Sequence, residues 1–253
     1  MTNTVPVIAV FDIGKTYKKC LLFNDAYHLE WETQVKFSEI SDDDGFPCDN
    51  LEALSAWVRE TIRALLQMPR FRVEAINFAA YGASWVYIDA LGQPVTPLYN
   101  YLKPYPAALQ ERFYHTYGGA TTFSVRTASP VLGHLNSGLQ LYWLKNEKPA
   151  AFKRIQFALH LPQYISYLVT GVPCADITSI GCHTGLWDFP AHRYHEWLEK
   201  ERLMDVMAPL LTQREPVLLR FNGRSVYAGS GLHDSSAALV PYLRCFSEPF
   251  VLL

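Results

Sequence analysis

The 253-residue chain carries 22 basic and 24 acidic residues, and this net charge of -2 gives no reason to expect a nucleic-acid or anionic-membrane partner. Its composition, with 49% hydrophobic and 18% charged residues, is that of a globular protein with ample core. The apolar runs are far shorter than a membrane span, and the N-terminus lacks the basic region of a signal peptide. The 5 cysteines have no paired spacing, which favours reduced thiols in a cytoplasm over disulfides or a zinc site.

Three predicted strands open the chain. β-Branched and aromatic residues predominate in three consecutive segments, and short turns separate these segments. The predicted strands cover residues 5–12, 17–24 and 28–37. Because their connections are short, they predict an antiparallel meander.

A helix and two further strands come next. Asp49 or Asn50 caps a helix whose apolar residues recur at helical spacing as far as Leu65. Apolar runs over residues 75–81 and 85–89 predict two strands that are joined by a short turn.

The rest of the chain predicts helices and one more strand. A helical pattern extends from residue 104 to about residue 168, and residues 195–203 form another helix. A strand over 224–229 then leads into an apolar helix over 235–242. This order predicts an α/β fold with a mixed sheet, antiparallel in its first three strands and parallel beyond, with helices on both faces. The last residues, 249–253, have the character of a strand.

The letters Gly14-Lys15-Thr16 follow the first predicted strand, within VIAVFDIGKTYKKCLLFN, and suggest a P-loop. A P-loop needs glycine where this chain has Ala9, and it needs a helix where this chain predicts a strand. The P-loop interpretation therefore fails twice. What remains is an acid, Asp12, with a glycine, a lysine and a threonine in a tight turn between strands. Taken alone, such a turn can also be built simply by Asp and Gly, with the lysines solvated.

Asp234 follows a glycine-rich strand end, in AGSGLHDSSAALVPYL, and lies at or near the start of a helix. A carboxylate there can cap the helix by accepting unpaired backbone N–H groups. It can also be a general base that takes the proton from an attacking hydroxyl. The two roles compete, because N–H bonds lower the pKa of a carboxylate and weaken it as a base. His233 can likewise be a ligand contact or a hydrogen-bonded structural histidine.

A third set of residues follows a buried strand, in AAYGASWVYIDALGQPV. A glycine beside an aromatic residue, as in Tyr81-Gly82, suits a sugar pocket, where C–H faces pack on rings and hydroxyls seek polar groups. Trp85 can contribute to such a pocket, although its place in a strand favours core packing. His183, within DITSIGCHTGLWDF, is a further candidate, with packing or surface exposure as the alternative.

Together these motifs resemble the N-terminal half of an FGGY-family carbohydrate kinase, in the actin–hexokinase–Hsp70 superfamily. The resemblance is carried by FDIGKTYKK and by the three longer stretches quoted above, and it is nearest to the rhamnulokinase-like and fuculokinase-like branches. It implies that residues 1–253 form one ribonuclease-H-like (actin-like ATPase) domain, and that a second, adenosine-binding domain follows residue 253. The stretch LYNYLK, residues 98–103, departs from the pattern of many family members, which carry Trp or Tyr followed closely by Asp and Arg here, so the resemblance implies no particular sugar contact for this stretch.

The resemblance implies an ATP-dependent kinase that phosphorylates a small sugar, a ketose or deoxyketose, with Mg²⁺, and a domain that is inactive by itself. It is also compatible with a homodimer. The residues implied at the phosphate site are Asp12, which would hold Mg²⁺, together with Gly14, Lys15, Thr16 and Lys18. Those implied at the sugar site are Gly82, Trp85, His233, Ser235 and Asp234, the last as general base.

Two other classes of function remain open. An actin-like or sugar-sensing relative without catalysis would keep the fold, although the presence of both Asp12 and Asp234 argues against it. A Rossmann-type oxidoreductase requires G-x-G-x-x-G between a strand and a helix, and this chain has only one glycine in the right place.

Overall fold

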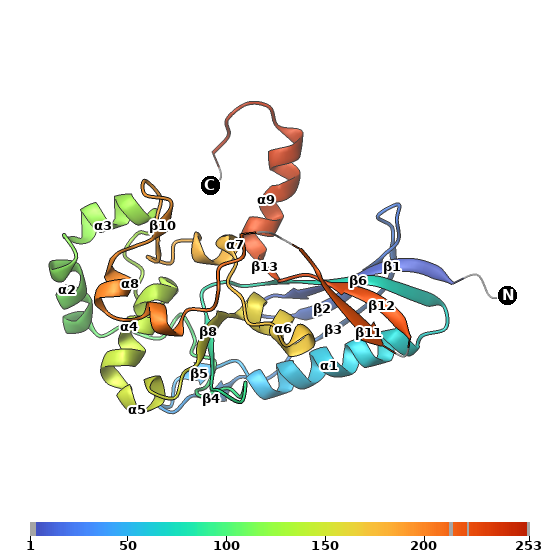
Figure 1. Ribbon diagram of the computed structural model, residues 1–253, viewed down its shortest axis with the longest axis horizontal. Coiled ribbons are helices and arrows are strands. Elements are labelled where there is room, and N and C mark those ends of the chain that lie inside the picture. The colour runs from blue at the N-terminus through green and yellow to red at the C-terminus, as the bar shows by residue number, and fades with distance from the viewer. Residues whose placement is uncertain (1–3, 213–214, 222, 252–253) are drawn as a thin grey trace.

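The computed structural model describes residues 4–212, 215–221 and 223–251. Its main sheet has the strand order β11-β12-β6-β1-β2-β3, and β13 pairs with the end of β6 (Figure 1). The strands are β1 (Val5–Ile13), β2 (Lys18–Phe23), β3 (Leu29–Val35), β6 (Phe71–Ala80), β11 (Val217–Phe221), β12 (Arg224–Ala228) and β13 (Leu232–His233).

The sheet is mixed, as the sequence predicts. β1, β2 and β3 form the antiparallel meander, while β6 is parallel to β1, and β12 and β13 are parallel to β6. The edge strand β11 was not predicted, and it runs antiparallel to β12. The expectation that every strand beyond the meander is parallel is therefore wrong at this edge.

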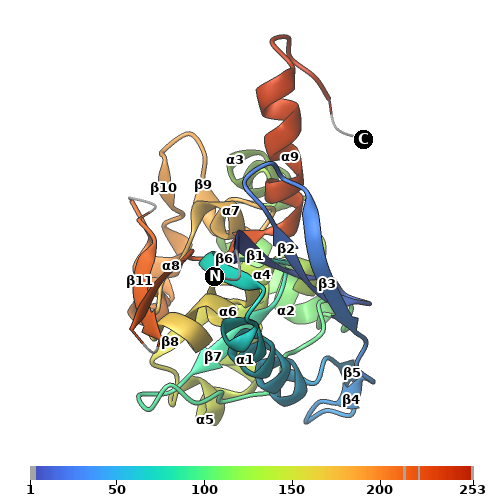
Figure 2. The same ribbon diagram turned by 90° about the vertical axis from the view of Figure 1, so that its right-hand side faces the viewer.

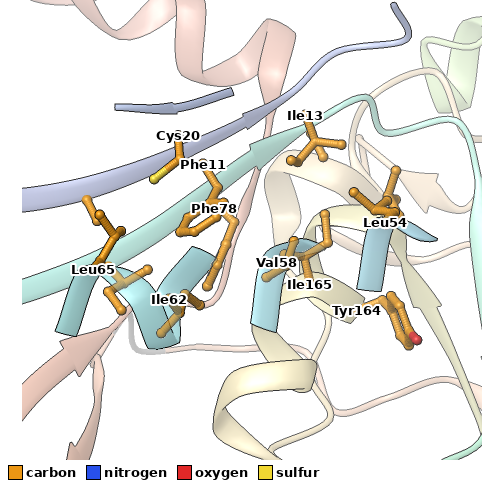
Figure 3. Close-up of a cluster of buried hydrophobic side chains, with 14 of the residues drawn as sticks. Phe11, Ile13, Cys20, Leu54, Val58, Ile62, Leu65, Phe78, Tyr164 and Ile165 are labelled. Atoms are coloured by element: carbon orange, nitrogen blue, oxygen red, sulfur yellow. The ribbon is translucent and has the colours of Figure 1, made fainter. Parts of the chain in front are cut away.

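One face of the sheet is buried by two helices. Alternate residues of β1, from Val7 to Ile13, are buried, whereas Ile8 between them is 44% exposed. This two-residue period assigns one face of the strand to the core. Helices α1 (Leu51–Gln67) and α6 (Leu161–Thr170) cover that face. Figure 3 shows the contact, where the sheet side chains meet a stripe of α1 and the neighbouring residues of α6: Phe11, Phe78, Leu54, Val58, Ile62, Leu65, Tyr164 and Ile165.

Helix α9 (Asp234–Cys245) stands on the other side of the sheet from α1 and α6, as both views show (Figures 1 and 2). Helices therefore lie on both sides of the sheet, as predicted. Beyond α9, residues 246–251 form no strand. The strand expected over residues 249–253 is thus not found at 249–251, and Leu252 and Leu253 lie outside the described residues.

A helical region with its own aromatic core lies beside the sheet (Figure 1). Phe113 is central to this core, and its ring contacts those of Phe123, Tyr142 and Trp197. The helices are α2 (Ala107–Thr116), α3 (Ala120–Thr127), α4 (Ser137–Glu147), α5 (Pro149–Phe152), α7 (Ile177–Ile180) and α8 (Trp197–Lys200), with short 3₁₀ helices at Gly133–Leu135 and Met204–Val206.

Three small antiparallel pairs complete the fold: β7 (Trp85–Ile88) with β8 (Phe157–His160), β4 (Ile40–Ser41) with β5 (Pro47–Cys48), and β9 (Trp187–Asp188) with β10 (Arg193–Tyr194). Strand β8 interrupts the segment that was predicted to be helical throughout. In the part of the chain that the structure describes, no helix is both long and apolar enough to cross a membrane.

Candidate active site

Three strand ends meet at one edge of the sheet. β1 ends with Asp12 and Ile13, the chain passes from β6 into Gly82, and β13 leads directly into Asp234. β1 and β13 both run parallel to β6, so their carboxyl ends lie at the same edge, where ligands bind in open α/β sheets. This edge places Asp12 and Asp234 within electrostatic reach of each other.

The pKa of Asp12 shows that influence. Burial raises the pKa of this carboxyl, the positive charge of Lys19 lowers it, and the negative charge of Asp234 raises it further, with a net upward shift. Lys19 is the cross-strand partner of Asp12 in the β1–β2 hairpin, so both side chains lie on the same face of the hairpin. Lys19 was not among the site residues predicted from the sequence.

The turn of the hairpin is tight. The Gly14 N–H donates to the carbonyl of Tyr17, and a Cβ at residue 14 would lie 3.2 Å from that carbonyl oxygen. Thr16 is exposed at the turn. Gly14 and Thr16 therefore both lie in this turn, and their contact with the ATP phosphates stays a prediction.

Lys18 lies on the opposite face from Lys19, and its expected place at the ATP phosphates must be corrected. Only 2% of its side chain is exposed, and its Nζ donates to Asp49 Oδ1 at 3.1 Å and to the Lys15 carbonyl at 3.0 Å. The alternation of side chains along β2 turns it away from Asp12. Lys15 is 28% exposed at the side chain, and its Nζ lies 2.5 Å from Asp49 Oδ2.

Asp49 lies beside the candidate site, and the sequence did not indicate a role for it there. It was a candidate helix cap, but Asn50 caps α1, because Asn50 Oδ1 accepts the N–H of Ala53 at 2.9 Å. The Asp49 carboxylate turns inward and accepts hydrogen bonds from both lysines and from the Tyr81 hydroxyl at 2.9 Å. Burial by itself would raise the pKa of Asp49, but these hydrogen bonds and the lysine charges outweigh burial and lower it.

A pocket of about 230 Å³ opens beside Asp234. It brings together four of the predicted sugar-site residues, Gly82, His233, Asp234 and Ser235. Its lining consists of Tyr81, Gly82, Ala83, Tyr101, Leu135, Cys182, His183, His233, Asp234 and Ser235. The presence of Tyr101 shows that the segment 98–103, although it departs from the family pattern, still contributes an aromatic ring.

Trp85 is the predicted sugar-site residue that the structure places elsewhere. Its side chain is fully buried in the helical region's core, and its Nε1 donates to the Ser137 carbonyl at 2.7 Å. Its ring stacks on His160 with a centroid distance of 3.6 Å. Trp85 therefore packs the core, and the expectation of a sugar contact is corrected.

The His233 ring packs directly against the backbone at Gly82. A Cβ at residue 82 would lie 2.1 Å from Cδ2 of His233, so only glycine lets this imidazole lie against the strand end. The His233 N–H donates to Thr178 Oγ1, and its Nε2 lies 3.4 Å from Asp234 Oδ1. Burial lowers the pKa of His233, although the Asp234 charge opposes this, so the imidazole favours its neutral form.

Asp234 is the first residue of α9, and His233 occupies the cap position. The carboxylate accepts one backbone N–H, that of Ser235, at 2.6 Å. It does not make the usual cap contact, in which the side chain before the helix accepts an N–H from the second or third helical residue. About 36% of its side chain is exposed, beside the pocket. The competition between capping and base catalysis is therefore weaker than the sequence suggested.

His183 lines the same pocket in a strained conformation. Its φ of 36° lies in the left-handed region, which is costly for a residue with a side chain. The buried Asn136 holds this peptide in place, because its Nδ2 donates to the His183 carbonyl at 2.7 Å. Strain that the surroundings maintain in this way is typical of functional sites.

The chemistry of the edge suits a hard divalent cation. Asp12 offers carboxylate oxygens. Burial is the main cause of its raised pKa, and Asp234 adds a nearby negative charge that a cation would offset. A second acidic group, Asp42 to Asp44, has oxygens within 4.8 Å of one another. Those carboxylates are already paired with Lys103 and Lys148, so they are better explained as a salt-bridge network.

Residues 7–203 match the N-terminal domain of the FGGY family of carbohydrate kinases. The fold is similar to that of a carbohydrate kinase from Novosphingobium aromaticivorans, with a TM-score of 0.81, 24% identity and coverage of 97% of this chain and 52% of that one. Ligand-bound xylulose kinase from Lactobacillus acidophilus gives a TM-score of 0.75 at 16% identity, with 93% and 49% covered. Plasmodium falciparum glycerol kinase with ADP gives 0.77 at 13% identity, with 93% and 50% covered. The chain thus spans about half the length of the solved structures it matches.

Proposed function

Because this chain belongs to the FGGY family of carbohydrate kinases, we propose that it forms the sugar-side half of a kinase that transfers the γ-phosphate of ATP to a hydroxyl of a small sugar, a ketose or deoxyketose. The observation that carries this proposal is the position of Asp234. Its carboxylate lies beside a polar pocket and within electrostatic reach of Asp12, at the edge of the sheet where ligands bind.

Asp234 is the general base of the proposed reaction. Its carboxylate accepts the proton of the sugar hydroxyl while the sugar oxygen bonds to the γ-phosphorus, and the bond from that phosphorus to the bridging oxygen of ADP breaks. A base of this kind contributes roughly 10²- to 10⁴-fold in rate, or about 3–5 kcal/mol. Since the transition state of phosphoryl transfer is loose, positioning and electrostatics supply most of the remaining barrier reduction.

The β1–β2 hairpin is the phosphate side of the proposed site. The side chains of Lys19 and Thr16 are available to phosphoryl oxygens at this turn, and Lys15 belongs to the same turn. Asp12 would hold a hydrated Mg²⁺, which neutralises phosphate charge when it is bound. Lys19 replaces Lys18 in this assignment, since Lys18 is buried on the opposite face.

The pocket is the sugar side. His233, Ser235 and His183 offer polar groups for hydroxyls, and Tyr101 offers a ring face for sugar C–H groups. Gly82 serves the pocket indirectly, because it leaves room for the His233 ring. This mixture of a few polar groups with aromatic surface supports a small polyhydroxylated substrate.

The test is an ADP-release assay on the complete protein with ATP, Mg²⁺ and a panel of sugars that includes xylulose, rhamnulose, fuculose and glycerol. We expect sugar-dependent ADP release, with a phosphorylated sugar as product. Binding of sugar and ATP without turnover of any sugar would instead support a non-catalytic, sugar-sensing relative. The 253-residue chain spans only half of its matches, so by itself we expect it to show no turnover.

A further inference from the structure

The carboxylate of Asp49 joins parts of the site that are distant in sequence. Its Oδ2 accepts from Lys15 Nζ and from the Tyr81 hydroxyl, and its Oδ1 accepts from Lys18 Nζ. The two lysines belong to the phosphate-side hairpin, whereas Tyr81 immediately precedes Gly82 in the sugar pocket. One buried group therefore fastens the two halves of the site together.

The charges of this cluster are balanced by a fourth group. Two ammonium groups surround the Asp49 carboxylate, and Lys15 Nζ also lies 3.7 Å from Glu39 Oε1, so two positive charges meet two negative ones. Lys18 and Asp49 are almost completely buried, whereas Lys15 keeps 28% of its side chain exposed. A buried ion cluster adds little to stability compared with well-packed apolar residues. This arrangement is easier to explain by a role in the site than by a role in folding.

Lys15 also extends toward the sugar pocket. Its Nζ lies 5.7 Å from the ring centroids of both Tyr81 and Tyr101, and both rings line the pocket. Asp49 retains Lys18 as a partner when Lys15 moves, so Lys15 can turn toward a phosphoryl oxygen without leaving a buried carboxylate unpaired. The position of Lys15 is thus set by a group that also holds the pocket wall.

We propose that Asp49 is a positioning residue for phosphoryl transfer, which holds the phosphate-side hairpin and the Tyr81 wall of the sugar pocket in register. The proposal rests on the proposed kinase function. Asp49 touches neither substrate. It acts through Lys15 on the nucleotide side and through Tyr81 on the sugar side, so its loss must affect both substrates together.

The experiment measures kcat and both KM values for the complete protein and for Asp49→Asn, Tyr81→Phe and Lys15→Met. Glu52→Gln, an exposed change nearby on α1, is the control and should behave as the parent. For Asp49→Asn we expect kcat/KM to fall about tenfold or more for ATP and for sugar alike, because a buried hydrogen bond to a charged group is lost at each end. Tyr81→Phe removes only the hydroxyl, and we expect the sugar KM to rise several-fold.

Asp49→Asn leaves Lys18 without its carboxylate partner and can prevent folding, so melting temperatures are measured in parallel. If Asp49→Asn does not fold, Lys15→Met and Tyr81→Phe decide the question, since both keep the Asp49–Lys18 pair. The proposal predicts that Lys15→Met raises the KM for sugar as well as for ATP. It is overturned if the folded variants have lower melting temperatures but unchanged kcat and KM values, or if Lys15→Met alters the ATP KM alone. If the parent protein turns over sugar and the variants have the same kinetic constants as the parent, only this inference is wrong. If the parent shows no turnover, both the kinase function and this inference are contradicted.

Discussion

Gly82→Ala tests whether the pocket depends on close contact between the strand end and His233. The added methyl carbon would lie 2.1 Å from Cδ2 and 2.7 Å from Nε2 of His233, so the ring must move. The backbone at Gly82 has no positive φ, so the cost is steric and not conformational. Overpacking of this kind costs about 1–3 kcal/mol. That loss corresponds to a fall of roughly 2–4 °C in melting temperature for each kcal/mol.

Gly82→Ala should lower activity by more than its loss of folding stability explains. His233 precedes Asp234 directly, so a displaced ring moves the proposed base, and a misplacement of about 1 Å can cost on the order of 10²-fold in rate. The assay is sugar-dependent ADP release by the complete protein. Gly118→Ala is the matched control, because it introduces strain at φ 89° with no atom within 4 Å. It should lose stability and keep kcat/KM.

The double variant Gly82→Ala with His233→Ala isolates the contact. Removing the ring relieves the clash, so the double variant should recover stability that Gly82→Ala loses, while activity stays low. A Gly82→Ala variant that keeps both the melting temperature and the turnover of the parent would contradict the dependence of the pocket on this contact.

Lys19→Met should raise the ATP KM about tenfold while changing the free energy of unfolding by less than about 0.5 kcal/mol. Lys18→Met should instead lower the melting temperature clearly. The opposite pattern would show that the two lysines lie on the opposite faces from those assigned here. A pH series tests His134, which is 1% exposed and whose pKa burial lowers to about 4. His134 binds a proton near pH 6.5 in the unfolded chain but only near pH 4 in the folded chain. The free energy of unfolding should therefore fall between pH 7 and pH 5, by about 2 kcal/mol from this group. In urea unfolding His134→Gln should show a smaller loss over that range, and an equal loss would exclude His134 as a source.

Local patterns predicted much of the fold. Apolar periodicity identified the meander, α1 and the strand that leads to α9, because each has a strong period or a turn signal of its own. Strand β8 (Phe157–His160) was missed because four residues between helices carry too short a pattern. Strand β11 was missed because its edge position depends on pairing with β12, which the sequence does not reveal.

The candidate site, like the fold, could be predicted only where a local pattern marks the residue. Asp12 and Gly82 were predicted as site residues because each lies where a predicted strand ends, and Asp234 because it follows a glycine-rich stretch at the start of a helix. The structure brings all three to one edge of the sheet. Lys18 was assigned to the wrong face, although counting alternate residues from Asp12 across the hairpin would have selected Lys19. Asp49 could not be assigned, because its partners Lys15 and Tyr81 lie 34 and 32 residues away, and its sequence position beside Asn50 indicates only a helix cap.

The most direct test of the account is the turnover number of Asp234→Asn in the complete protein, measured with saturating ATP and sugar. Asparagine keeps the shape and can still accept the Ser235 N–H, but it cannot take the proton from the sugar hydroxyl. We expect kcat to fall by roughly 10²- to 10⁴-fold while sugar binding, followed by calorimetry, stays close to that of the parent. Near-normal kcat in this variant would show that Asp234 only supports the start of α9, and the proposed mechanism would be wrong.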